Sequence, residues 1–161
     1  MTNALIPLRP VPPLAQDPSK ALDEILAWAE AEAVKQDAGL PSEWDQGHWA
    51  VDPTIFNKYD PANAIKTPVD CGTACCIAGR AVHQDGGLFL FDRYAGYAFS
   101  AEMPNGDVVD VESYAESRLG LTPGQSEALF WSGNKIEDIR RIVAAIKAGI
   151  LYPAYEDDED Y

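Results

Sequence analysis

The pattern of apolar residues predicts two long amphipathic helices, one near each end of the chain. Asp17-Pro18 has the form of a helix N-cap followed by proline at the first helical position, and Gly39 is a suitable terminator. Between them, apolar residues recur every three or four positions, as on one face of a helix: Leu22, Ile25, Leu26, Ala29, Ala33 and Val34. The sequence therefore predicts a helix over residues 18–38.

The second long helix is predicted over residues 135–149. Residues 134–137 have the form of a capping box that starts it, and Gly149 loosens its end. Its buried stripe is expected to comprise Ile136, Ile139, Ile142, Val143, Ile146 and Ile150. Its outer face is expected to carry Arg140, Arg141 and Lys147.

Strand-forming residues lie between these helices, in residues 88–91, 96–100 and 108–111. Asn105-Gly106 is a strong signal for a hairpin turn, so we expect a hairpin near residues 96–112 within a small antiparallel sheet of two or three strands. Two shorter helices follow the hairpin, and the second begins at the capping box Thr122-Pro123-Gly124-Gln125. The predicted fold class is α+β and mostly helical.

All three cysteines lie within residues 71–76. Thr67-Pro68-Val69-Asp70 has the form of a capping box and predicts a helix over residues 70–85 that ends at Gly86-Gly87. Small apolar residues cover most of the circumference of this helix. We therefore expect it at the centre of the fold, packed by the amphipathic helices, with its cysteines acting as small hydrophobic residues.

Two chemical alternatives remain open for the cysteine segment. Cys71 at the helix N-terminus would be a stabilised thiolate, and His48 is the one realistic base for a hydrolase or transferase. Alternatively, Cys71, Cys75 and His48 would ligate one metal ion. Against a metal site, the chain lacks a second C-x-x-C or H-x-x-H pair. Against a nucleophile, the cysteine segment departs from the nucleophile pattern of papain-like proteases. We therefore predict no catalytic residue, no metal and no cofactor.

The chain is strongly acidic, with a formal net charge of −14 at pH 7. Such a surface repels phosphate backbones, which argues against direct nucleic-acid binding and favours a basic protein partner. The candidate partner-binding residues are Asp107, Asp110, Glu112, Glu156, Asp157, Asp158, Glu159 and Asp160. A further alternative is a nucleic-acid mimic, which requires carboxylates spaced like phosphates.

Composition divides the chain into a proline-rich mobile arm (1–16), one globular domain (17–153) and an acidic tail (154–161). Trp131, between the last two predicted helices, is expected to cover the core of the domain. The N-terminus lacks the features of a signal peptide, and no stretch is long enough to span a bilayer. Three cysteines within six positions do not form a disulfide framework, and they are expected to be reduced thiols. These features predict a cytoplasmic protein.

Residues 71–81 resemble a recurring C-G-T-x-x-C-x-A-G-x-A pattern. Downstream, a matching L-G-L…L-F…N segment comprises Leu119-Gly120-Leu121, Ala128-Leu129-Phe130 and Asn134. The pairing is similar to that in small uncharacterised proteins of actinobacterial phages and of bacteria, over about residues 44–150. The resemblance implies a small α-rich domain without an assigned activity and, for a phage product, the binding of a host protein. We therefore predict a non-enzymatic protein–protein interaction module that modulates a host protein through its acidic surface.

Overall fold

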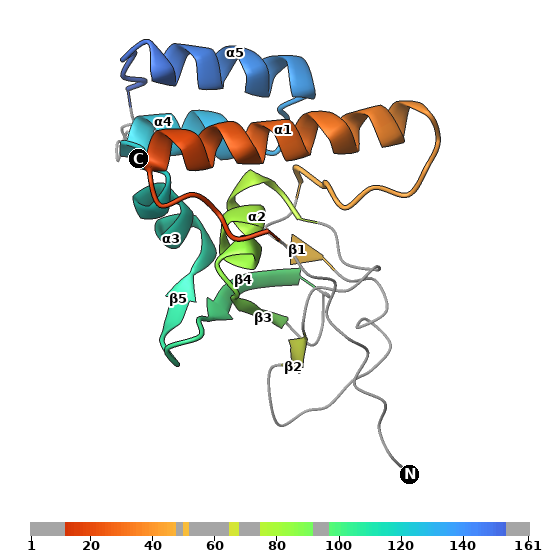
Figure 1. Cartoon of the computed structure of the whole chain (residues 1–161), viewed down its shortest axis with the longest axis vertical. Helices are drawn as coiled ribbons and strands as arrows, with labels where there is room; N and C mark the ends of the chain where they lie inside the picture. The colour runs from red at the N-terminus through yellow and green to blue at the C-terminus, as the bar shows by residue number, and fades with distance from the viewer. Residues whose placement is uncertain (1–11, 48–49, 52–64, 68–74, 92–96, 154–161) are drawn as a thin grey trace, which may run out of the picture.

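The computed structural model of the chain describes residues 12–47, 50–51, 65–67, 75–91 and 97–153, and these residues form an α+β fold dominated by helices (Figure 1). The predicted fold class is therefore confirmed. The elements in chain order are α1 (Pro18–Asp37), β1 (Ala50–Val51), β2 (Ile65–Thr67), α2 (Ile77–Gln84), β3 (Leu88–Phe91), β4 (Tyr97–Glu102), β5 (Val108–Asp110), α3 (Val111–Arg118), α4 (Pro123–Phe130) and α5 (Ile136–Lys147).

The strands form one antiparallel sheet with the order β1-β4-β3-β2, and β5 also pairs with β4. β1 pairs with Tyr97 and Ala98 of β4, whereas β5 pairs with its last three residues, 100–102. The sheet is larger than predicted, because β1 and β2 come from the proline-punctuated residues 40–70. That region carries no strand signal of its own, and its strands depend on pairing with β4 and β3.

The core lies between layers of helices and the sheet. Figure 1 shows α1 and α5 side by side, with α2 and α3 between them and the sheet, and α1 contacts both α5 and α2. Burial of a large apolar side chain contributes about 1.5–3 kcal/mol to folding. The largest fully buried apolar side chains are Phe89, Ile25, Ile77, Leu129, Ile139, Val82 and Val111.

Several helix ends follow the local signals in the sequence. Asp17 caps α1 with its side chain, as predicted. Both halves of the predicted capping box form at α4, where the Gln125 N–H donates to Thr122 Oγ1 (3.2 Å) and the Thr122 N–H donates to Gln125 Oε1 (2.9 Å). Gly39 and Gly120 follow α1 and α3 with φ of 71° and 64°, in a left-handed region that favours glycine.

The predicted start of the central helix is wrong. α2 begins at Ile77, and Thr67, the expected N-cap, lies in β2. Residues 68–74 fall outside the described part of the chain. The end of the helix is close to the prediction, with Gly86 at a φ of 85° just after it.

Cys75 lies before α2 in extended backbone, although it was expected within the helix. Its N–H donates to the carbonyl oxygen of Glu43 (2.8 Å), and its own carbonyl oxygen accepts the N–H of Asp45 (2.9 Å). These bonds form a short parallel bridge between Cys75 and Trp44. The helix starts late because a segment distant in sequence satisfies the backbone of Cys75.

α5 and α3 differ from the predictions at their ends. The N-cap of α5 is Lys135, one residue after Asn134, and its N–H donates to Asp138 Oδ2 (2.9 Å). Ile150 was expected in the buried stripe but is 52% exposed, because the helix ends before it. Val111 was expected in the return strand but begins α3, where it is fully buried.

Residues 12–16 belong to the predicted mobile arm but pack against the domain. Leu14 is buried, Gln84 donates to the carbonyl oxygen of Pro12 (3.0 Å), and Arg118 donates to that of Ala15 (2.7 Å). The other residues of the predicted arm and the acidic tail lie outside the described residues. Within the described ranges, no helix has the length and apolar character needed to cross a membrane.

Candidate functional site

The connection between α4 and α5, residues 131–135, is fixed by two side-chain amides that cap the end of α4. The last carbonyls of a helix have no donors within the helix and need other partners. Asn134 Nδ2 donates to the carbonyl oxygens of Ala128 (2.7 Å) and Leu129 (3.1 Å). Gln46 Nε2 donates to those of Leu129 (3.0 Å) and Trp131 (3.2 Å). Both amides are buried, so the connection is anchored to a segment more than eighty residues earlier.

Gln46 is positioned by the segment 42–47, which lies against the C-terminal half of α1. Trp44 Nε1 donates to Gln46 Oε1 (3.2 Å), and this orients the amide toward the end of α4. Gln36 of α1 donates through Nε2 to the Trp44 carbonyl oxygen (2.7 Å). A chain of hydrogen bonds therefore runs from α1 through Trp44 and Gln46 to the connection 131–135.

Glu32 is a buried carboxylate that holds the same segment to α1. It is 4% exposed, and its Oε2 accepts the Glu43 N–H (2.8 Å) while its Oε1 accepts from Lys35 Nζ (2.7 Å). Burial alone would raise the pKa of Glu32, but hydrogen bonds from Lys35 and from the Glu43 N–H outweigh it and leave the pKa below its usual value. The carboxylate is therefore ionised and paired at neutral pH.

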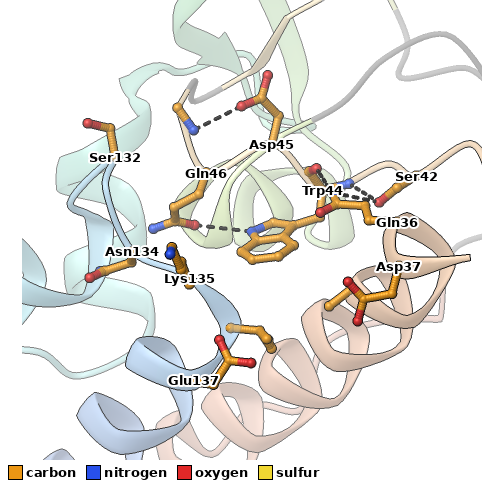
Figure 2. Close-up of a pocket in the computed structure, with 13 residues that line it drawn as sticks. Gln36, Asp37, Ser42, Trp44, Asp45, Gln46, Ser132, Asn134, Lys135 and Glu137 are labelled. Atoms are coloured by element: carbon orange, nitrogen blue, oxygen red, sulfur yellow. Dashed lines mark hydrogen bonds between the residues drawn. The ribbon is translucent and has the colours of Figure 1, made fainter. Parts of the chain in front are cut away.

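A cleft of about 910 Å³ opens between α1, this segment and the start of α5 (Figure 2). We call it the polar cleft. In Figure 2 the Trp44 ring lies at its centre, with Asp37 approaching from α1 and Glu137 from α5. Its charged lining residues are Asp37, Asp45, Glu137 and Lys135. The surplus of carboxylates suits a cationic group, since opposite charges attract at short range.

A second hollow, of about 860 Å³, lies on the α4 side of the connection. We call it the Trp131 groove, and its apolar lining comprises Ala128, Trp131, Ile142, Tyr152 and Pro153. Trp131 is 63% exposed, so the expectation that it covers the core is wrong. Its ring packs on its own loop instead. The ring lies so close to Gly133 that a Cβ added there would be only 2.5 Å from Trp131 Cη2.

The two described cysteines, Cys75 and Cys76, are buried beside α2, whereas Cys71, the suggested nucleophile, lies outside the described residues. Cys76, at the N-cap of α2, is 1% exposed and Cys75 is 2% exposed. Burial raises the pKa of the Cys76 thiol to about 12, and the nearby N–H groups of Gly79 and Ala78 offset only part of this effect. Burial also raises the pKa of the Cys75 thiol well above its usual value. Cys76 therefore lies at a helix N-terminus, which lowers the pKa of its thiol, but desolvation of the thiolate raises this pKa by more.

We expect Cys75 and Cys76 to be unreactive in the folded protein. A thiol with a pKa of about 12 has a thiolate fraction of roughly one in ten thousand near pH 8. A Cys71→Ser protein should therefore show no rapid reaction with a thiol-specific reagent in native buffer, and should react at two thiols after unfolding. Rapid labelling of either residue in the folded variant, located by mass spectrometry, would contradict this assignment.

The proposed catalytic pair and metal site cannot be assembled from the described residues. Cys71 and His48 both lie outside them, which leaves Cys75 alone from the proposed ligand set. Among the described residues, no group of three His, Cys, Asp or Glu side chains is arranged to hold a metal ion. Comparison of the chain with family models, with curated proteins and with solved structures finds no match.

The predicted partner-binding acids either do not line the two hollows or lie outside the described residues. Asp107 is exposed in the β4–β5 turn, and Asp110 accepts a backbone N–H as the N-cap of α3. Glu112 is partly buried, and burial, followed by the nearby charge of Asp110, raises its pKa. The acids of the tail, 156–160, lie outside the described residues.

Sequence reasoning missed the residues that build the two hollows. Gln46 lies in an irregular region with no periodic pattern, and its partners on α4 are distant in sequence. Asn134 was assigned to a helix cap, although its side chain serves the preceding helix instead. One usable signal was Trp131-Ser132-Gly133, in which a large aromatic residue stands two positions before a glycine, which has no Cβ.

Proposed function

We propose that this protein is a non-enzymatic interaction module that binds a basic segment of a protein partner around the connection 131–135. The observation that carries the proposal is the charge of the two hollows beside this connection. Their linings include five carboxylates and two cations, namely Asp37, Asp45, Glu127, Glu137 and Asp138 against Lys135 and Arg141. Together with the net charge of −14, this surface attracts a basic polypeptide and repels a nucleic acid.

A binding role is also supported by what lines the hollows. The described lining of neither hollow includes a cysteine or a histidine, and the two described thiols are buried. Following the resemblance noted from the sequence, we further propose that the protein is a phage product that acts in the cytoplasm. Its partner would then be a host protein, which it would modulate by covering a basic surface.

The test of this proposal is the binding of a short peptide of alternating lysine and serine to the full-length protein, measured by fluorescence anisotropy. We expect binding that weakens strongly between about 0.05 M and about 0.3 M NaCl, because the screening length for exposed charges falls from about 14 Å to about 6 Å over this range. The corresponding glutamate–serine peptide should not bind. Equal binding of the two peptides, or no binding of the lysine peptide, would refute the proposal.

Two matched variants locate the binding surface. Asp37→Asn with Glu137→Gln removes two exposed charges from the polar cleft, and Asp107→Asn with Asp110→Asn removes two from the β4–β5 hairpin. We expect only the first pair to weaken binding, by about threefold to tenfold. Asn also serves as an N-cap, so the second variant should remain folded. The opposite ranking would place the partner at the hairpin.

A further inference from the structure

Trp131 is presented to solvent by a specific local structure. Most tryptophans bury a large apolar area, yet this one is 63% exposed at the end of α4. Its ring is packed against its own loop, since a Cβ at Gly133 would fall within 2.8 Å of three ring carbons. Its carbonyl oxygen accepts hydrogen bonds from Gln46 (3.2 Å) and from the Asn134 N–H (3.1 Å). The backbone at Trp131 is therefore held by hydrogen bonds, and its exposed indole lies against Gly133.

The groove beside the indole offers an apolar floor with an acidic rim. Ile142 is 6% exposed and Ala128 is partly buried, so the floor belongs to the core layer between α4 and α5. At the rim, Asp138 pairs with Arg141 (3.1 Å), and Glu127 is a further carboxylate. Tryptophan is one of the residues enriched at the energetic centre of protein interfaces, and it is the best aromatic partner for a cation.

We propose that the Trp131 groove binds a short segment of the partner in which a lysine or arginine stacks on the Trp131 indole while a neighbouring apolar side chain enters the groove. This inference rests on the proposed function and adds the anchor residue and the sequence chemistry of the partner. Charge decides the occupant. A second copy of this chain carries the same net charge of −14 and is repelled, whereas a basic segment is attracted to the carboxylates on both sides of the connection 131–135.

The test compares two peptides of equal length and charge, one alternating lysine with leucine and the other lysine with serine. We expect the leucine peptide to bind the full-length protein at least about tenfold more tightly, because its apolar side chains are buried in the groove. Trp131→Ala should remove most of this difference. Phe99→Ala is the matched control, because Phe99 is also an exposed aromatic (59%) but lies on β4, outside both hollows.

A second variant tests whether binding depends on the position of the indole and not only on its presence. Gly133→Ala keeps Trp131 but displaces its ring, so we expect it also to weaken binding of the leucine peptide by about threefold or more. Unchanged thermal unfolding of each variant shows that the fold is intact, and unchanged sedimentation shows that the groove does not join two copies. Self-association of the wild-type protein that Trp131→Ala abolishes would overturn the assigned occupant.

The outcomes distinguish this inference from the function on which it rests. If Trp131→Ala leaves leucine-peptide binding unchanged while the Asp37→Asn and Glu137→Gln pair weakens it, the groove is not the anchor site but the acidic interaction surface stands. If a glutamate–leucine peptide binds as tightly as the lysine–leucine peptide, stacking of a cation on the indole is refuted. If the lysine–serine peptide does not bind, the proposed function falls, and if the lysine–leucine peptide also fails to bind, the groove assignment falls with it.

Discussion

Arg118→Met is expected to destabilise the protein by about 3 kcal/mol, because Arg118 joins three parts of the fold at one buried point. Its Nε donates to Asp85 Oδ2 (2.8 Å), which ties the last residue of α3 to the end of α2. Its terminal nitrogens also donate to the carbonyl oxygens of Leu14 (3.3 Å) and Ala15 (2.7 Å), before α1. Both charged side chains are only 15% exposed. Methionine keeps most of the apolar stem but removes these donors, so that among the described residues the Asp85 carboxylate keeps only the hydrogen bond from the Tyr114 hydroxyl (2.6 Å).

Thermal or urea unfolding followed by circular dichroism measures this change, which corresponds to a fall in Tm of about 10 °C for a chain of this length. Arg140→Met is the matched control. Arg140 pairs with Glu30 at 3.4 Å, but its side chain is 49% exposed, so its loss should cost less than about 0.5 kcal/mol. If the two variants lose similar stability, the contacts of Arg118 with Asp85 and with residues 14–15 contribute little.

Several helix ends could be predicted from the sequence because their causes are local. The side chain of Asp17 and the reciprocal bonds of Thr122 and Gln125 satisfy backbone groups within the same turn. Glycine after α1 and α3 takes a backbone conformation that other residues rarely adopt. No distant part of the chain is needed for either effect, so the residue types alone indicate them.

The start of α2 and the additional strands could not be predicted in this way, because they depend on pairing between distant segments. The backbone of Cys75 is hydrogen-bonded to that of Glu43 and Asp45. These two residues lie about thirty positions earlier, in a segment with no recognisable strand pattern. β1 and β2 likewise form only against β4 and β3. The capping pattern at Thr67 was a sound local signal, but the strand pairing of that residue takes precedence.

The candidate site was the least predictable part of the molecule. The acidic composition indicated a basic partner, but it did not indicate which carboxylates gather around a hollow. The connection 131–135 is shaped by Gln46, whose amide reaches carbonyl oxygens more than eighty residues away. Such a contact has no signature in sequence spacing. The exposure of Trp131 depends in turn on this anchoring and on Gly133, so it could be recognised only after the fold was known.

His83 is expected to make the protein less stable in mild acid. Burial, assisted by the neighbouring charge of Arg80, lowers the pKa of His83 to about 4 in the folded protein. The unfolded chain takes up the proton near pH 6.5, so stability is complete above pH 6.5 and falls as the pH is lowered toward 4, with no further loss from this group below that. A shift of this size corresponds to about 3 kcal/mol, and partial solvent exposure of the ring reduces the expected loss to about 2 kcal/mol.

The measurement is the free energy of unfolding by urea at several pH values between about 4 and about 7. Carboxylates also take up protons on acidification, so the informative quantity is the difference between the wild-type protein and His83→Gln. That variant cannot take up the proton and should lose less stability on acidification. Parallel curves for wild type and His83→Gln would mean that His83 is protonated equally easily in both states, and that its burial on α2 does not affect its pKa.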